Sequence, residues 1–292
     1  MAKLVELIAV PHDPTLPIAH RLNRIGKADP GAIPALNHFE TLREKLERAK
    51  PDVIVVIGSD HLNQWFMDNM APFMVGKASR LRGPFENEVR SWGLKEFDLV
   101  IDGELARQIL KGGLNRGVDF AFSDEFAADH SFTIPLEFLR PQDDLPVVPI
   151  FINLLMPPVP PGWRYYQVGT IIRQAIGDAD PDKRVAIVVT GHMSNSVGGP
   201  QMLRNQVEPL SVWDGETWEL IRANRIEDIL QRSTFDQLYA VGNGTPGFLG
   251  YVLALGIAGG APASFAELVA TTAQPAAAFL EWDEERLEGE VT

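Results

Sequence analysis

The chain has 292 residues, of which 39 are acidic and 26 basic, a formal net charge of −13, and 45% hydrophobic residues. This acidic balance, without a cluster of Lys and Arg among aromatic residues, argues against nucleic acid and anionic membranes as partners. The absence of cysteine excludes disulfides, a thiolate nucleophile and thiolate metal ligands, so His, Asp and Glu are the ligand types available to a metal ion.

The N-terminal segment MAKLVELIAVPHD contains a short apolar run but lacks the longer apolar region and cleavage site of a signal peptide. No stretch approaches the roughly 18 apolar residues of a membrane-spanning helix. We therefore expect a cytoplasmic protein. The length is short for two full domains, so we expect one domain over residues 1–292, with a peripheral acidic tail from Glu281 to Thr292.

The first elements along the chain predict an α/β protein. Leu4 to Val10 reads as a strand that ends at Pro11, with His12 just beyond it. Apolar residues at helical spacing predict an amphipathic helix from Phe39 to Ala49. The uninterrupted apolar run from Val53 to Ile57 is typical of a strand that is covered on both faces. The order strand, helix, strand favours a sheet flanked by helices.

The same alternation continues along the rest of the chain. It predicts helices at Leu105 to Leu110 and Tyr166 to Ile176, strands at Pro146 to Asn153 and Arg184 to Thr190, a helical stretch from Trp213 to Arg232, a helix or turn at Phe235 to Tyr239, and a buried helix from Gly247 to Gly259. The run GNGTPG before that last helix matches GxGxxG, but it lacks a clear strand-helix-strand unit around it and predicts only a turn.

Four of the six histidines follow strands or lie in a polar loop. His12, His61 and His192 come directly after predicted strands, and His130 lies in the loop AADHSF. Carboxyl ends of parallel strands face the crevice where ligands bind, so the pattern predicts that these imidazoles gather there. Imidazole is the usual nitrogen ligand of Fe, Zn, Cu and Ni, and it also transfers protons. Any one of these histidines alone is more readily explained as an ordinary loop residue.

An aspartate neighbours three of these histidines. Asp13, Asp60 and Asp129 could each orient an imidazole from behind or cap a turn. The sequence contains neither a GxSxG elbow nor a phosphate-binding P-loop, which leaves the hydrolase and nucleotide-binding classes that use them unsupported.

Several segments in order resemble the class III extradiol ring-cleavage dioxygenases, the family of protocatechuate 4,5-dioxygenase and 2,3-dihydroxyphenylpropionate 1,2-dioxygenase. The segments that carry the resemblance are PHDP, SDHLNQWFMDNMAPFMVG, ADHSFTIPLEFL, VPIFIN, TGHMSNSVGGP and WDGETWELIRANRI. The resemblance covers most of the chain. It implies a single α/β domain with a mixed central sheet flanked by helices, assembled into a homo-oligomer or a hetero-oligomer with a related subunit.

The resemblance also implies site residues and a cofactor. In this family two histidines and one glutamate hold Fe(II), which leaves positions free for a catechol-like aromatic and O₂. By motif, His12 and His61 match the two histidine ligands, and His130 matches an acid or base near the substrate. Asn195 stands where the family has a second acid-base histidine, and Gly247 stands where it has the carboxylate ligand.

His192, three residues before Asn195, is a candidate to compensate. It could supply a proton or complete a three-histidine metal site, or it could point away from the site. We therefore expect an extradiol-type oxidoreductase at a non-haem metal. Two alternatives stay open. The same pocket could perform metal-independent or Zn-assisted lyase or hydrolase chemistry on a related aromatic, or the chain could be a non-catalytic subunit of a hetero-oligomeric dioxygenase.

Overall fold

A mixed sheet of eight strands forms the centre of the molecule. The structure, a computed structural model, describes residues 2–27, 29–198, 200, 210–271, 274 and 276–288. The strand order in the sheet is β6-β3-β7-β2-β8-β1-β10-β9. The four middle strands, β7 (Val147–Ile152), β2 (Val53–Gly58), β8 (Arg184–Thr190) and β1 (Lys3–Val10), run parallel. The α/β class and the mixed central sheet that the sequence predicts are confirmed.

The outer strands run in both directions. On one side β3 (Phe73–Gly76) is antiparallel to β7 and parallel to β6 (Ala121–Ser123). On the other side β10 (Ala277–Asp283) is antiparallel to β1 and to β9 (Phe265–Val269). A separate ribbon pairs β4 (Arg80–Gly83) with β5 (Phe97–Val100). Two outer strands therefore flank the four parallel strands on each side.

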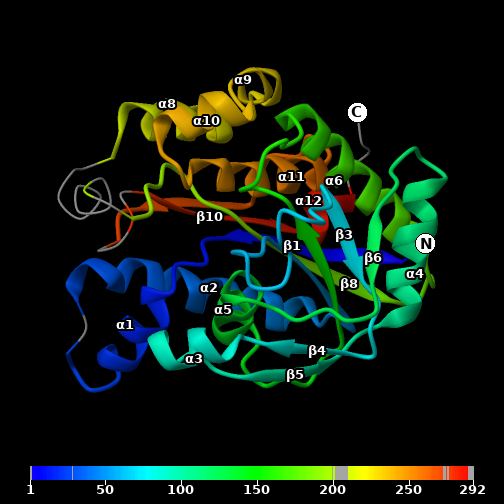
Figure 1. Cartoon of the computed structure of the whole chain (residues 1–292), viewed down its shortest axis with the longest axis horizontal. Coiled ribbons are helices and arrows are strands. Elements are labelled where there is room, and N and C mark those ends of the chain that lie inside the picture. Colours follow the sequence, from blue (N-terminus) through cyan, green and yellow to red (C-terminus); the bar gives the residue numbers. More distant parts are fainter. Residues whose placement is uncertain are drawn as a thin grey trace.

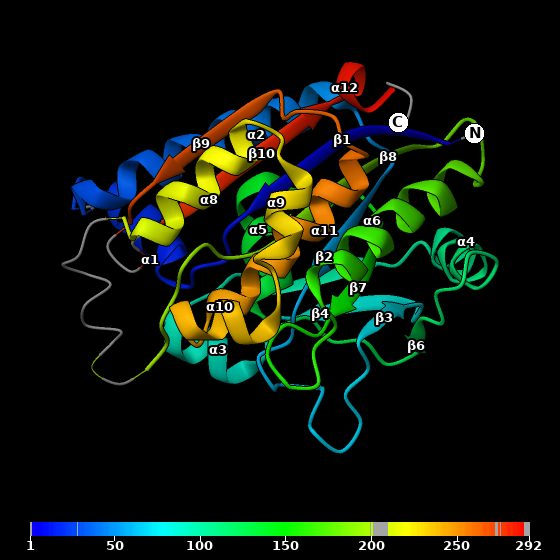
Figure 2. The same cartoon turned by 90° about the horizontal axis from the view of Figure 1, so that it is seen from above.

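Helices cover both faces of the sheet, as Figures 1 and 2 show. One face carries α1 (Thr15–Asn23), α2 (Ile33–Ala49), α3 (Glu86–Trp92) and α5 (His130–Leu139); the other carries α4 (Gly103–Leu114), α6 (Gly162–Gly177), α8 (Val212–Arg222), α9 (Ile226–Gln231), α10 (Phe235–Val241) and α11 (Phe248–Ala258), and short helices are η1 (Pro30–Ala32), η2 (Thr245–Gly247) and α12 (Glu284–Glu288). No helix among the described residues is both long and apolar enough to cross a membrane.

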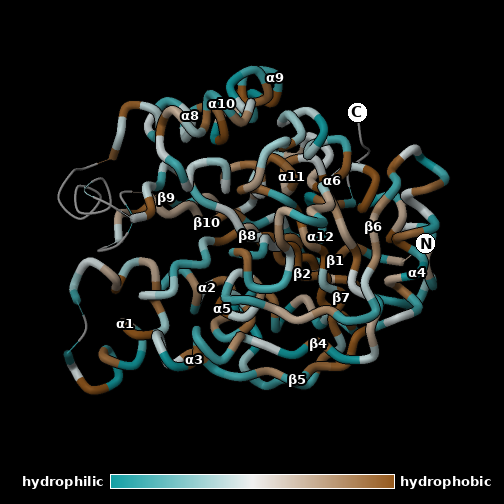
Figure 3. Tube along the Cα trace, viewed as in Figure 1, coloured by the Kyte–Doolittle hydropathy of each residue, from teal (hydrophilic) through white to brown (hydrophobic). Residues whose placement is uncertain are grey.

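Alternate residues of the middle strands feed two separate cores. In β2, Val53, Val55 and Ile57 pack with α6 and α11, whereas Ile54 and Val56 pack with α2 and α5. Successive side chains of a strand point to opposite faces, so a strand buried on both faces must be apolar at every position. This requirement explains the uninterrupted apolar runs in the sequence. Figure 3 shows these hydrophobic strands at the centre of the molecule.

Two predicted elements differ in detail from the structure. The helical stretch from Trp213 to Arg232 is two helices, α8 and α9, because the chain turns at Asn224, which has a positive φ of 52°. His130 is the first residue of α5 and not a loop residue. The GNGTPG run follows α10 and not a strand, so it is a turn, as predicted, and not a dinucleotide-binding loop.

The predicted peripheral tail begins too early. Glu281 to Asp283 belong to β10, where Glu281 and Trp282 are buried, and Glu284 to Glu288 form α12. An acidic residue is tolerated in this strand because Lys45 Nζ lies 2.9 Å from the Glu281 carboxylate. Residues 289–292 of the predicted tail, and Gly199 in the turn after β8, lie outside the described residues.

Candidate active site

Three histidines lie at the carboxyl ends of neighbouring parallel strands. His12 follows β1 after one proline, His61 follows β2 after two residues, and His192 follows β8 after one glycine. Because β8 lies between β2 and β1, the three strand ends stand side by side. Such an edge is where α/β proteins bind their ligands. The topology thus explains why buried strands carry a histidine at their ends.

The fourth histidine comes from the start of α5. The His130 ring stacks on the His61 ring, with centroids 4.1 Å and planes 25° apart. The His12 ring contacts all the others, since its centroid lies 5.3 Å from that of His61, 5.6 Å from that of His130 and 4.1 Å from that of His192. We call these four residues the histidine cluster. His20 and His38 lie elsewhere and pack on phenylalanine rings.

Asp129 fixes the orientation of His61. Its Oδ2 atom lies 2.6 Å from His61 Nδ1 and accepts a hydrogen bond of 2.9 Å from the His61 main-chain N–H. Burial alone would raise the pKa of Asp129, but the charges of His61 and His130 and these hydrogen bonds lower it below its usual value. The carboxylate is therefore ionised and Nδ1 carries the proton. Burial lowers the pKa of His61, but the Asp129 carboxylate raises it above its usual value overall. A metal ion would therefore displace a proton from Nε2 to use its lone pair.

Glu88 likewise fixes the orientation of His130. The Glu88 Oε1 atom lies 2.6 Å from His130 Nδ1, and both side chains are buried. Trp92 packs its ring edgewise on His130, with centroids 5.2 Å apart. Glu88 is the acidic residue that the sequence did not single out, because nothing near it in the chain marks it. Its burial in α3, 42 residues before His130, is visible only in the fold.

His12 is the most deeply buried member of the cluster. It is 1% exposed, and neither of its ring nitrogens has a hydrogen-bond partner. Burial, followed by the nearby imidazoles of His192, His61 and His130, lowers its pKa well below the usual value. A buried polar atom without a partner is costly, so two on one ring point to a missing ligand.

His192 lies between His12 and the turn that precedes α11. A Cβ atom placed on Gly247 would lie 2.7 Å from His192 Cδ2 and 3.1 Å from His192 Cβ. On the ring's other edge, Nδ1 lies 3.1 Å from the side-chain nitrogen of Gln274. Burial, followed by the charges of His61 and His130, lowers the pKa of His192 to about 3. The ring is therefore neutral at physiological pH.

Asn195 holds the turn that contains Gly247. Its main-chain N–H donates to Thr245 Oγ1 over 3.1 Å, and its carbonyl accepts from the Gly244 N–H over 2.9 Å. Its side chain packs against Gly244. These contacts connect the end of β8 to the start of α11, and a catalytic role for Asn195 stays a prediction.

The three aspartates beside the histidines have different roles. Asp60 Oδ2 accepts hydrogen bonds from the main-chain N–H groups of Asn63, Gln64 and Trp65, and so it caps the loop after β2. Asp13 Oδ1 accepts from the main chain and hydroxyl of Thr15. Only Asp129 both caps a helix and orients a cluster imidazole among these three.

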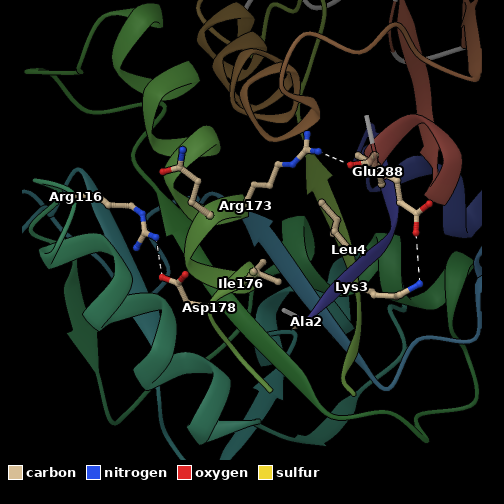
Figure 4. A pocket seen from close by; sticks show the side chains of 11 residues that line it. Ala2, Lys3, Leu4, Arg116, Arg173, Ile176, Asp178 and Glu288 are labelled. Carbon is tan, nitrogen blue, oxygen red and sulfur yellow. Dashed lines mark hydrogen bonds and ion pairs between the residues drawn. The ribbon is translucent and has the colours of Figure 1, made fainter. Parts of the chain in front are cut away.

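The cluster opens to solvent on the side of His61. The His61 side chain is 30% exposed, whereas His12, His130 and His192 are 1%, 6% and 9% exposed. A separate cavity of about 640 Å³ lies at the start of β1, at the opposite end of the strands (Figure 4). Its charged lining is paired internally: Arg116 lies 2.7 Å from Asp178, and Arg173 donates to the carbonyls that end α11. This cavity is not part of the cluster.

The cluster suits a divalent metal ion that is bound by nitrogen. One nitrogen each from His12, His61 and His130 lie within 4.8 Å of one another. Two imidazoles bound to one ion by bonds of about 2.1 Å have centroids roughly 5 Å apart, close to the separation of His12 and His61. Within the described part of the chain, no carboxylate oxygen joins both His12 and His61 in such a group. The donor set is therefore imidazole-rich and lacks the carboxylate that the resemblance implied.

Comparison with known proteins identifies the family. Residues 7–279 match the model of a family described as the catalytic LigB subunit of aromatic ring-opening dioxygenase. The chain belongs to the LigB family. The resemblance inferred from the motifs is thereby confirmed, and its residues His12 to Gly247 all lie within the matched range.

This LigB-family chain is similar to relatives that carry a more specific name. It is 34% identical over 164 residues to a 2,3-dihydroxyphenylpropionate/2,3-dihydroxicinnamic acid 1,2-dioxygenase of Rhodococcus jostii, covering 56% of this chain and 49% of the relative. It is 31% identical over 201 residues to the enzyme of the same name from a Rhodococcus species, covering 68% and 58%. The matches span about half the length of these relatives.

A solved structure supports the fold. The crystal structure of the uncharacterized protein JW3007 from Escherichia coli K12 aligns with a TM-score of 0.57 at 15% identity, covering 94% of this chain and 99% of that one. At this identity the likeness shows the fold and does not extend to the site.

Proposed function

We propose that this chain is an extradiol dioxygenase that opens a catechol-like aromatic ring with O₂ at Fe(II) held by His12 and His61. The observation that carries the proposal is the histidine cluster, which the family's sheet places at the carboxyl ends of β1, β2 and β8. The names of the relatives suggest a catechol with a carboxylate side chain, such as 2,3-dihydroxyphenylpropionate.

Two histidines are suited to hold the ion. His12 is neutral and buried with both ring nitrogens unpartnered, and His61 offers Nε2 because its Nδ1–H donates to Asp129. A carboxylate behind a ligating imidazole fixes the ring and strengthens the metal bond. Fe(II), when bound, supplies the redox chemistry that joins both atoms of O₂ to the ring.

His130 is suited to move the substrate's proton. Glu88 accepts a hydrogen bond from Nδ1–H, so Nε2 is available to take a proton from a catechol hydroxyl. The Glu88 carboxylate would then stabilise the imidazolium that forms. Trp92 packs edgewise on the ring and restricts its rotation. His130 would thus act as a base for substrate binding and as an acid when the proton is returned.

The proposal is tested by O₂ consumption after anaerobic reconstitution with Fe(II). We expect one O₂ for each 2,3-dihydroxyphenylpropionate consumed, and we expect the His12→Ala and His61→Ala variants to lose both iron and activity. His130→Ala should keep its iron and lose about 10² to 10⁴-fold in kcat. His20→Ala, which removes an imidazole outside the cluster, is the control. Stoichiometric iron without O₂ uptake on any catechol would reject the proposal.

One observation favours a second candidate function. By the family resemblance, Gly247 stands where the carboxylate ligand is expected, and Asn195, in place of a histidine, cannot shuttle protons at neutral pH. These differences suit a lyase or hydrolase that uses His130 as the base on a related aromatic, with Zn(II) or without a metal ion. They equally suit a non-catalytic subunit that supports a catalytic partner. Turnover of the aromatic that persists with chelator and without O₂ would favour the altered chemistry. Co-purification of a related subunit would favour the supporting role.

A further inference from the structure

We propose that His192 is the third protein ligand of the metal ion and occupies the space of the carboxylate that Gly247 lacks. This inference rests on the metal site of the proposed function. It assigns to His192 the metal-binding role that a carboxylate at position 247 would otherwise fill.

Packing makes side chains at the two positions mutually exclusive. Any Cβ at position 247 would approach His192 Cδ2, Cβ and Cγ to 2.7, 3.1 and 3.2 Å. The two backbones are in close contact here, because α11 begins directly against the end of β8. A Cβ on Gly250 would overlap the Thr190 carbonyl oxygen, and one on Gly191 would lie 2.9 Å from the Gly247 carbonyl. Gly247 therefore provides the room in which the His192 ring lies.

The His192 ring packs against His12, the imidazole that is best prepared to bind a metal ion. The His192 centroid is 4.1 Å from that of His12, whose two ring nitrogens have no partner. His192 is 9% exposed and comes from the strand between those that carry His12 and His61. The His192 nitrogens lie outside the group that His12, His61 and His130 form within 4.8 Å. On our proposal the His192 ring therefore turns toward the ion when metal binds, which completes a donor set from three adjacent strand ends.

Gln274 supplies the outer partner that a ligating imidazole needs. Its side-chain nitrogen lies 3.1 Å from His192 Nδ1, while its Oε1 atom is buried without a partner. Turning this amide by 180° brings Oε1 to the ring, where it accepts the Nδ1 proton and leaves the Nε2 lone pair for the ion. A bound metal would favour this orientation.

Three neutral imidazoles give the site different chemistry from two imidazoles and a carboxylate. The metal centre keeps a charge of +2 instead of +1, which strengthens its attraction for an anionic, chelating oxygen ligand such as a catecholate. Nitrogen donors also suit Zn(II) and Co(II) as well as Fe(II). His130 stays outside this set, with its proton held by Glu88 for acid-base work.

The test is a Co(II) titration of the full chain, followed by absorbance and calorimetry, with no substrate or O₂. We expect one Co(II) per chain, and a Kd at least 10-fold weaker in His192→Ala with a changed visible spectrum. The double variant His192→Ala/Gly247→Glu should recover tight binding with a spectrum that shows an added oxygen ligand. Gly247→Glu alone should bind poorly because the two side chains collide. His20→Ala is the control.

Several outcomes would overturn the inference. Unchanged affinity and spectrum in His192→Ala would do so, as would loss of Co(II) binding in His130→Ala with none in His192→Ala. His192→Gln, which keeps the bulk and polarity of the side chain, repeats the test should His192→Ala unfold. Co(II) binding through His192 without O₂ uptake by the iron-loaded chain would reject the proposed function and leave this inference standing.

Discussion

Asp129 illustrates how one buried residue can serve both the fold and the site. Its two oxygens accept hydrogen bonds from the main chain and ring of His61 and from the main chain and hydroxyl of Ser131. The Ser131 bonds start α5, which places His130, and the His61 bonds set the free nitrogen of that ring. A single carboxylate therefore positions two imidazoles that come from segments 69 residues apart in the sequence.

The Asp129→Asn variant should weaken both properties. An amide cannot accept all four hydrogen bonds, so a buried donor is left without a partner and the free energy of unfolding should fall by about 2–4 kcal/mol. Affinity for Co(II) should fall about 10- to 100-fold. Urea denaturation and the Co(II) titration measure the two effects. Asp124→Asn, an exposed acid paired with Lys77, should change neither.

Glu88→Gln should separate proton transfer from metal binding. The amide can still hydrogen bond to His130, but it no longer stabilises the imidazolium, so kcat for O₂ consumption should fall about 10- to 100-fold. The Kd for Co(II) should not change, because His130 is not assigned to the metal. Glu86→Gln, on the exposed side of α3, is the matched control. A weaker Kd with unchanged kcat would make His130 a ligand.

At the scale of elements, glycines let α11 lie close to its neighbours. A Cβ on Gly256 would overlap the carbonyl oxygen of Tyr166 in α6, and one on Gly169 in α6 would overlap that of Leu253 in α11. These two helices therefore touch backbone to backbone. The same closeness at the start of α11, where Gly250 meets β8, presses the Gly247 turn onto His192.

Gly256→Ala should be destabilising. The added methyl group forces α6 and α11 apart, at a cost of about 1–3 kcal/mol in the free energy of unfolding. Gly215→Ala in α8 is the control, since a Cβ there meets open space and should stabilise the helix by about 0.5–1 kcal/mol. Thermal unfolding of both variants distinguishes the close contact from simple helix propensity, because propensity alone would raise the stability of both.

The sequence predicts the elements whose signal is local. Uninterrupted apolar runs such as Val53 to Ile57 mark the middle strands because burial on both faces demands them. The outer strands are short or pair with strands far away in the chain. For example, β10 pairs with β1 across more than 270 residues, and its partly acidic sequence resembles a tail. The partners Glu88 and Gln274 could not be predicted, since only the folded chain brings them to His130 and His192.

At the scale of the whole molecule, a buried acid links stability to pH. Glu6 lies midway along β1, next to Glu281 of β10. Burial, followed by the charge of Glu281, raises the pKa of Glu6 from 4.5 to about 9. The folded chain therefore keeps this proton between about pH 5 and 9, while the unfolded chain releases it. Stability attributable to Glu6 is complete below the unfolded pKa and declines as the pH rises through this window.

The Glu6→Gln variant should remove this pH dependence. The loss in the wild-type chain is at most about 1.4 kcal/mol per pH unit for one proton. From pH 5.5 to 8.5, Glu6→Gln should therefore gain stability relative to the wild-type chain, as measured by urea midpoints at both values. Parallel pH profiles for the two proteins would show that Glu6 does not hold its proton.

One isotope-labelling measurement tests most directly whether this chain opens an aromatic ring with O₂ at its histidine cluster. The chain reconstituted with Fe(II) would be given 2,3-dihydroxyphenylpropionate under ¹⁸O₂, and the product analysed by mass spectrometry. The account predicts a ring-opened product that carries both ¹⁸O atoms before exchange with water, and no product from His61→Ala. An intact ring, or a ring-opened product free of ¹⁸O, would contradict it.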